Sequence, residues 1–178
     1  MAYIGLAYPI IARKRDGPEY YDGILTGKAV EAEITPNYID TSGYTDINDL
    51  GQKKEFAYAD IKLTTSDLPD TARALALGES DGVSRDRDES GMIGLGLMRT
   101  RIVDDRVTYE AIWLHQTKLW EASGTSSTRG ETVDFQTPAL EGVAEPDENG
   151  EWRTTKQFGT RNEALSWLKE KAGMEGET

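Results

Sequence analysis

The sequence predicts a β-rich α+β domain, with two packed antiparallel sheets in a sandwich-like or barrel-like fold and one or two short helices laid on them. Three observations predict this class. Apolar and polar residues alternate in several segments, glycine and proline turns separate these segments, and only two stretches combine helical periodicity with capping residues. Since 178 residues suit one domain, we expect a single domain over residues 1–173 and a flexible tail over residues 174–178.

The N-terminal part is predicted to supply two strands. Residues 4–12 form a strand that Pro9 interrupts, which favours a position at a sheet edge or in an arm. In residues 28–35, small and aliphatic residues alternate with Glu31 and Glu33. Such alternation is typical of a half-buried strand whose polar face meets solvent.

Residues 36–53 are predicted to be a long arm. Pro36 is expected to end the preceding strand, and the segment that follows is polar and contains turn residues. A connection of this length in a compact domain is usually functional. Tyr38 and Tyr44 lie in it, so we interpret the arm as a contact element and these tyrosines as interface candidates.

A third strand over residues 55–64 is expected to lead directly into a helix. Ser66 or Asp67 is predicted to cap this helix, Pro69 suits its first turn, and Gly78 suits its left-handed end. The helix then presents one apolar face, made of Leu68, Ala72, Leu75 and Ala76.

Residues 92–103 and 107–120 are predicted to form a hairpin around a turn at Asp104, after a charged, solvated loop over residues 79–90. Both strands carry apolar residues on both faces, which is typical of strands covered from two sides. Two explanations stay open with equal weight. The strands are covered by another sheet and a helix of the same chain, or a neighbouring subunit covers part of them.

The C-terminal part is predicted to contain a strand over residues 131–144, a turn over residues 146–150, and a strand over residues 151–158. Thr160 and Glu163 have the spacing of a capping box that opens the second helix. The inward residues expected here are Val133, Phe135 and Ala139 in the strand and Ala164, Leu165, Leu168 and Ala172 in the helix, which Gly173 ends.

Composition excludes several classes of function. The chain has no cysteine and one histidine, His115, so disulfides, thiolate metal sites and two-histidine metal sites are excluded. We expect His115 to be packed or hydrogen-bonded. A net charge of -12 disfavours tight nucleic-acid binding. No stretch is long and apolar enough to span a membrane, and the N-terminus lacks signal-peptide features, so we expect a soluble protein made in a cytoplasm.

The search for catalytic or cofactor motifs is negative. Residues 91–96 resemble a phosphate loop only in their glycine content, and residues 86–97 lack the final glutamate of a calcium loop. We therefore predict no enzyme, no metal and no cofactor. The glycines are interpreted as positions that let a neighbouring backbone or subunit approach closely.

Several short motifs, in order, resemble the major tail (tube) protein family of bacteriophages with long non-contractile tails. They are Gly27-Lys28-Ala29-Val30, Phe56-Ala57-Tyr58-Ala59-Asp60, the helix end Ala74-Leu75-Ala76-Leu77-Gly78, Gly91-Met92-Ile93-Gly94-Leu95-Gly96, and Tyr109-Glu110-Ala111-Ile112-Trp113-Leu114 followed by Lys118-Leu119. The similarity spans residues 3–172, and the order of the motifs carries it more than any one of them.

This resemblance implies a structural virion protein that assembles into hexameric rings, whose sheets join into a β-barrel and whose rings stack into a tube. Its implied partners are further copies of itself, a tape-measure protein and a tail terminator, and DNA passes through without tight binding. No membrane is involved. The implied location is the virion tail, and the host cytoplasm during assembly.

On this basis we assign candidate residues to two surfaces. Subunit-interface candidates are Tyr38, Tyr44, Arg99 and Arg101, and the arginines are expected to pair with acids of the next subunit. Lumen candidates are Glu31, Glu33 and Glu110, because an acidic wall repels the phosphate backbone. Two alternatives remain: a β-sandwich module, for example a carbohydrate-binding decoration domain with a tryptophan-lined groove, and a tube subunit of a contractile or secretion apparatus.

Overall fold

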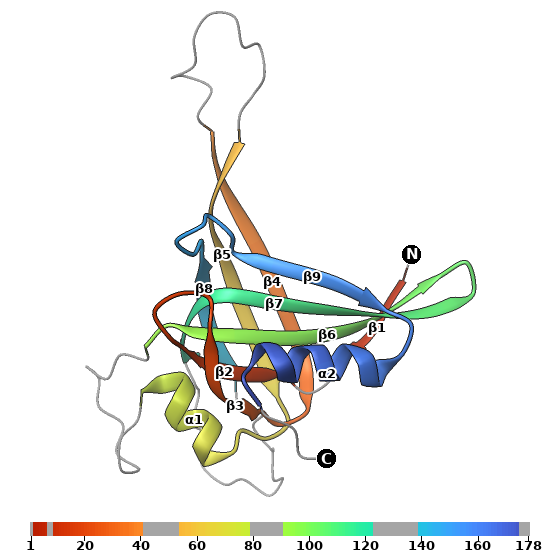
Figure 1. Cartoon of the computed structure of the whole chain (residues 1–178), viewed down its shortest axis with the longest axis horizontal. Coiled ribbons are helices and arrows are strands. Elements are labelled where there is room, and N and C mark those ends of the chain that lie inside the picture. The colour runs from red at the N-terminus through yellow and green to blue at the C-terminus, as the bar shows by residue number, and fades with distance from the viewer. Residues whose placement is uncertain (1, 7–8, 41–53, 79–90, 123–138, 175–178) are drawn as a thin grey trace, which may run out of the picture.

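The computed structural model describes residues 2–6, 9–40, 54–78, 91–122 and 139–174 (Figure 1). Within these residues two helices and nine strands follow one another, so the predicted β-rich α+β class is confirmed. They are β1 (Ala2–Leu6), β2 (Ile10–Lys14), β3 (Tyr20–Leu25), β4 (Ala29–Asp40), β5 (Lys54–Thr65), α1 (Asp70–Leu77), β6 (Ile93–Val103), β7 (Arg106–Glu121), β8 (Ala139–Glu145), β9 (Arg153–Phe158) and α2 (Arg161–Lys171).

The sheet is built around the long hairpin of β6 and β7. On the side away from β7, the first half of β6 pairs with β2 and its second half pairs with β1. On the side away from β6, the first half of β7 pairs with β9 and its second half pairs with β8. Beyond β8 come β5 and β4, all antiparallel. The described strands thus form one hydrogen-bonded network, in which β4 and β5 run steeply across the nearly horizontal β6, β7 and β9 (Figure 1).

Two core clusters lie on opposite faces of this hairpin. Leu95, Leu97 and Leu114 belong to one cluster, which α1 and the inner faces of β5 and β8 complete. Trp113 and Met98 belong to the other, which α2 covers. The apolar residues in the middle of β6 and β7 are therefore covered on both faces by elements of the same chain, whereas Val107 and Trp120 near the two ends of β7 stay exposed.

The glycines of β6 make room for a side chain of the same subunit. A Cβ atom at Gly94 or Gly96 would lie within 3.0 Å of the Trp113 ring, and at Gly94 also of the Tyr20 ring. Tyr20 meets Trp113 edge-on, with ring centroids 4.9 Å apart. The close approach expected for these glycines is thus made by an indole ring and not by a backbone.

Strand β4 corrects the prediction that Pro36 ends it. The strand continues through Pro36, which pairs with Ala59, to Asp40, which pairs with Lys54. Among the described strands β4 has one neighbour, β5, so a missing N–H is tolerated at this edge. Residues 36–40 of the predicted arm are therefore strand, and residues 41–53 lie outside the described residues.

The helix ends are partly as predicted. Helix α1 is capped by Pro69 without any side-chain cap, so Ser66 and Asp67 do not cap it, but Gly78 ends it with φ 72°. Helix α2 begins at the predicted capping box, in which Thr160 accepts from the Glu163 backbone and Glu163 accepts from that of Thr160.

Two strand predictions need correction. Strand β3 was not predicted, and the alternation in β8 is opposite to the predicted one, because Leu140, Gly142 and Ala144 are its buried residues. Ala139 is half-buried on the other face. Residues 131–138, and with them Val133 and Phe135, lie outside the described part.

Candidate functional site

One face of the sheet is left open by the described elements. In β4, β5, β8 and the end of β7, alternate residues pack into the core, and the residues between them point outward. Direct cross-strand pairs place the outward residues in rows. One row runs Glu33, Lys62, Glu141, Trp120, and the next runs Thr35, Asp60, Val143, Lys118. We call this surface the open face.

A groove of about 250 Å³ lies in the open face. Its charged residues come from three adjacent strands: Glu33 from β4, Asp60 and Lys62 from β5, and Glu141 from β8. Trp120 of β7 forms one side of the groove and is 45% exposed. Asp60 accepts a hydrogen bond from Asn37 at 2.8 Å.

The open face ends in two strand edges. Strand β4 forms one edge. At the other edge, β7 continues to Glu121, whereas its pairing with β6 ends at Thr117, opposite Ile93. Residues 118–121 therefore have a β-partner on the β8 side alone among the described strands. Backbone N–H and C=O groups along such edges can pair with a further strand.

The lumen candidates separate into two locations. Glu31 and Glu33 are exposed on the open face, as predicted. Glu110 is buried, with 6% of its surface exposed, and its carboxylate forms ion pairs with Arg99 and with Arg101, the latter at 3.7 Å. Glu110 therefore does not face solvent, and the two arginines balance its negative charge inside the subunit.

The interface candidates also lie in different places. Arg99 and Arg101 both pair with Glu110 of their own chain, whose single carboxylate matches one of the two positive charges. Their pairing with acids of the next subunit stays a prediction. Tyr38 is 54% exposed near the end of β4 and contacts Phe56 edge-on, with ring centroids 6.0 Å apart. Tyr44 lies outside the described residues.

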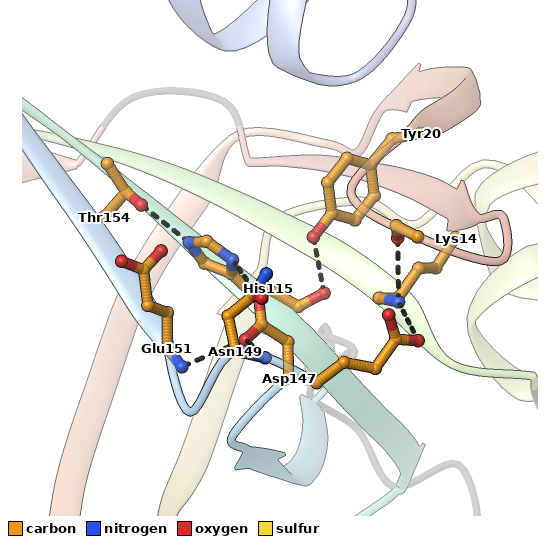
Figure 2. A network of polar contacts seen from close by, with 9 residues as sticks. Lys14, Tyr20, His115, Asp147, Asn149, Glu151 and Thr154 are labelled. Atoms are coloured by element: carbon orange, nitrogen blue, oxygen red, sulfur yellow. Dashed lines mark hydrogen bonds and ion pairs between the residues drawn. The ribbon is translucent and has the colours of Figure 1, made fainter.

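A polar centre lies where β8 and β9 diverge from β7 (Figure 2). His115 is the residue of β7 between the two pairings, since Leu114 pairs with β9 and Gln116 with β8. Its backbone N–H donates to the Trp152 carbonyl at 3.0 Å, and its carbonyl accepts from the Tyr20 hydroxyl at 2.7 Å.

Both ring nitrogens of His115 are also engaged. Nδ1 lies 2.9 Å from Asp147 Oδ2, and Nε2 lies 2.6 Å from Thr154 Oγ1 (Figure 2). A hydroxyl can donate or accept, so Thr154 can satisfy Nε2 in the neutral and in the protonated ring. The predicted hydrogen-bonded imidazole is confirmed.

Asp147 is held ionised by its surroundings. Burial raises its pKa, but hydrogen bonds from the backbone N–H groups of Glu151 and Asn149, together with His115, outweigh burial and lower the pKa below its ordinary value. The side chain of Asp147 is 8% exposed. The centre therefore contains a largely enclosed carboxylate that accepts hydrogen bonds from two backbone N–H groups and contacts the His115 ring.

The polar centre also has the residue types of a metal site. Ligand atoms of His115, Asp147 and Glu151 lie within 4.8 Å of one another. However, Asp147 and Thr154 already occupy both His115 nitrogens, and a metal ion would have to break one of these hydrogen bonds. Hydrogen bonding accounts for the arrangement, and we assign the centre a structural role.

Sequence reasoning missed the groove residues Trp120, Glu141 and Lys62. A usable signal was present for Trp120, because it follows the buried Leu119 in a strand and so must point to the opposite face. Glu141 and Lys62 could not be joined to it without the strand order.

No family model matches the chain, and a search of the curated proteins returned no match either. In the residues that the structure describes, no helix is long and apolar enough to cross a membrane.

Proposed function

We propose that this chain is the subunit of a phage tail tube, a structural protein that assembles into rings that stack around a lumen. The observation that carries the proposal is the open face with a strand edge on each side. A face left open by its own chain, next to edges able to pair further, suits a subunit that is completed by its neighbours.

The strand directions support closure of such a ring. Neighbouring strands in the order β4, β5, β8, β7 are antiparallel, so β4 and β7 run in opposite directions. If the β4 edge of one subunit meets the β7 edge of the next, the new pair is also antiparallel. Strand directions then alternate across every junction between subunits. A head-to-tail contact of this kind closes into a ring when the rotation from one subunit to the next divides a full turn evenly.

The charges of the open face support a lumen. Its outward acids are Glu31, Glu33, Asp60, Glu141 and Glu145, against the two lysines Lys62 and Lys118. In a closed barrel this face would line the channel, and its net negative charge would repel phosphate, which favours sliding of DNA over binding. The assembly itself is the activity, and no catalysis is involved.

Negative-stain microscopy of the concentrated protein tests this proposal. The net charge of -12 opposes association, so we expect monomers when the protein is dilute and rings or tubes when it is concentrated, with salt promoting assembly by screening. A protein that stays monomeric by light scattering at every concentration and salt would contradict the proposal. A tube subunit of a contractile or secretion apparatus gives the same result, and belongs to the same structural class.

One observation favours a second candidate, a carbohydrate-binding decoration domain. That alternative requires an exposed groove lined by tryptophan, and Trp120 lines such a groove. It predicts a stable monomer that binds a neutral oligosaccharide and forms no rings. The same microscopy and scattering measurements therefore separate the two candidates.

A further inference from the structure

We propose that Asn149, in the turn between β8 and β9, is a site of spontaneous deamidation and that the hydrogen bonds of Asp147 set its rate. Asparagine is a thermolabile residue. It loses its amide most readily when glycine follows, because glycine has no Cβ to hinder attack by its own backbone nitrogen. Asn149 and Gly150 form the only Asn-Gly pair in the sequence. The inference concerns one subunit and does not depend on the proposed function.

The reaction needs no reactant except water. The backbone nitrogen of Gly150 gives up its proton and attacks Cγ, the side-chain carbonyl carbon of Asn149. A new bond from this nitrogen to Cγ closes a succinimide ring, the bond from Cγ to the amide nitrogen breaks, and that nitrogen takes up the proton and leaves as ammonia. Water then opens the ring at either carbonyl, which gives isoaspartate or aspartate. Both products carry one more negative charge than asparagine.

The turn leaves the side chain of Asn149 free to rotate toward the nitrogen of Gly150. Both residues are exposed. Within the described residues the Asn149 side-chain amide makes no hydrogen bond, since only its backbone N–H is engaged, by Asp147 Oδ1 (Figure 2). Gly150 has a φ of 79°, in the left-handed region that favours glycine. The turn geometry therefore favours at position 150 the residue that the reaction needs.

The hydrogen bonds of the same turn slow the reaction. The Gly150 N–H donates to the Asp147 carbonyl at 2.9 Å, and this is the proton that must leave before the nitrogen attacks. Asp147 Oδ1 also accepts from the backbone of Asn149 and Glu151, and its Oδ2 lies 2.9 Å from His115 Nδ1. The attack therefore requires the turn to open. Local opening costs less free energy than global unfolding, so the folded protein can react.

Either product weakens the hold of this turn on His115. Isoaspartate adds one methylene group to the main chain ahead of Gly150, which displaces the N–H groups of Gly150 and Glu151 from Asp147. Aspartate keeps the backbone path, but its new carboxylate lies in one short turn with Asp147, Glu148 and Glu151, and like charges repel. The modification therefore removes interactions that limited its own rate.

Incubation of the dilute full-length protein in mildly alkaline buffer, followed by trypsin digestion and mass spectrometry, tests the proposal. The readout is the mass that the tryptic peptide 130–153 gains when an amide becomes a carboxylate, with fragmentation to locate it. A sample digested without incubation corrects for conversion during digestion. A free peptide of residues 145–153 gives the rate without the fold.

The variants separate the reacting side chain from the turn that controls it. Asn149→Gln keeps the backbone donor to Asp147, but glutamine closes the corresponding larger ring far more slowly. Asp147→Ala removes the side-chain acceptor, and Asp147→Ser takes its place if the alanine variant does not fold. Asp16→Ala, at an exposed acid in a bend of the chain, is the matched control. Hydrogen exchange of the Gly150 amide measures the opening of the turn.

We expect conversion at Asn149 in the folded protein, roughly tenfold slower than in the free peptide, because several hydrogen bonds of modest net strength must open first. Asp147→Ala should raise both the conversion rate and the exchange rate of the Gly150 amide at least about fivefold. Asp16→Ala should leave both rates unchanged, and Asn149→Gln should abolish the mass gain. Asn37 and Asn162, which tyrosine and glutamate follow, should stay unmodified.

Three results would overturn the proposal. They are no conversion at Asn149 when the free peptide has largely converted, conversion at Asn37 or Asn162 at the same rate, and an unchanged rate in a folded variant of Asp147. Because the protein is kept dilute and no readout depends on rings, each of these results leaves the proposed function standing. Failure to form tubes would likewise leave the deamidation site standing.

Discussion

His115 lies at the point where the partner of β7 changes from β9 to β8, and it bonds to the elements on each side. Its four polar atoms hold β3 through Tyr20, the β8–β9 turn through Asp147 and Trp152, and β9 through Thr154. From the sequence, a hydrogen-bonded imidazole could be predicted, because one histidine in a strand has few other roles. Its partners could not, since Tyr20 lies 95 residues away and contacts of that range depend on strand order.

The pKa of Asp147 gives a prediction for stability. Because this pKa is lowered in the fold, its contribution is present above the unfolded pKa of about 3.9 and is lost as the pH falls through the folded value. Asp147→Asn should cost about 1–2 kcal/mol at pH 7, where the charged hydrogen bonds are lost. The difference in unfolding free energy between this variant and wild type should shrink below about pH 4.

Urea unfolding at a series of pH values measures this difference. The control is Asp16→Asn, because Asp16 is an exposed acid in a bend of the chain. A difference that stays constant down to pH 2 would contradict the assignment.

At the scale of elements, the alternation of apolar and polar residues predicted most strands. The features that it misjudged depend on where a strand lies in the folded sheet. The strand over residues 55–64, the β6–β7 hairpin and the capping box of α2 follow local patterns and were predicted. Pro36 was misjudged because a proline ends a central strand but is tolerated at an edge, and edge status is a property of the whole sheet. Glu110 was placed outside for a similar reason, since only the fold shows Arg99 and Arg101 beside it.

The β4–β5 hairpin makes a prediction about the arm. Asp40 pairs directly with Lys54, so a two-residue Asn-Gly turn can replace residues 41–53 and close the hairpin. We expect this variant to keep its melting temperature within a few degrees and to form no tubes, because the arm is proposed to contact a neighbour. Calorimetry and negative-stain microscopy measure the two properties. Normal tubes from the shortened chain would show that the arm has no part in assembly.

At the scale of the whole molecule, the proposed role rests on the charge and shape of one face. The lumen predicted from the sequence included Glu31 and Glu33, which the structure places on the open face, and it missed Glu141 on the same face. Strand alternation indicates which residues share a face of one strand. The assembly of several strands into a surface depends on pairings that no local pattern contains.

Charge reversal on this face should affect DNA passage more than assembly. Glu31 and Glu33 are both exposed, so changing both to lysine should leave the fold and the tube intact. Phosphates would then find cations to hold them, and genome ejection should slow. Ejection kinetics from virions with both substitutions measure this, and Glu170→Lys on α2 is the control. Ejection at the wild-type rate would refute the lumen assignment without refuting the tube.

The most direct test of the tube proposal is disulfide cross-linking between the two open edges. The chain has no cysteine, so paired substitutions at Glu33 or Thr35 on β4 and at Lys118 or Trp120 on β7 introduce the only thiols. Within one subunit these positions are three strand steps apart, about 14 Å, whereas a disulfide requires Cα atoms about 4.4–6.8 Å apart. Oxidation of the assembled protein should therefore give a ladder of covalent oligomers that ends at the ring size in at least one pair, while each single-cysteine variant stops at dimers. If no pair gives more than a dimer in protein that has visibly assembled, the two edges do not meet and the proposed ring junction is wrong.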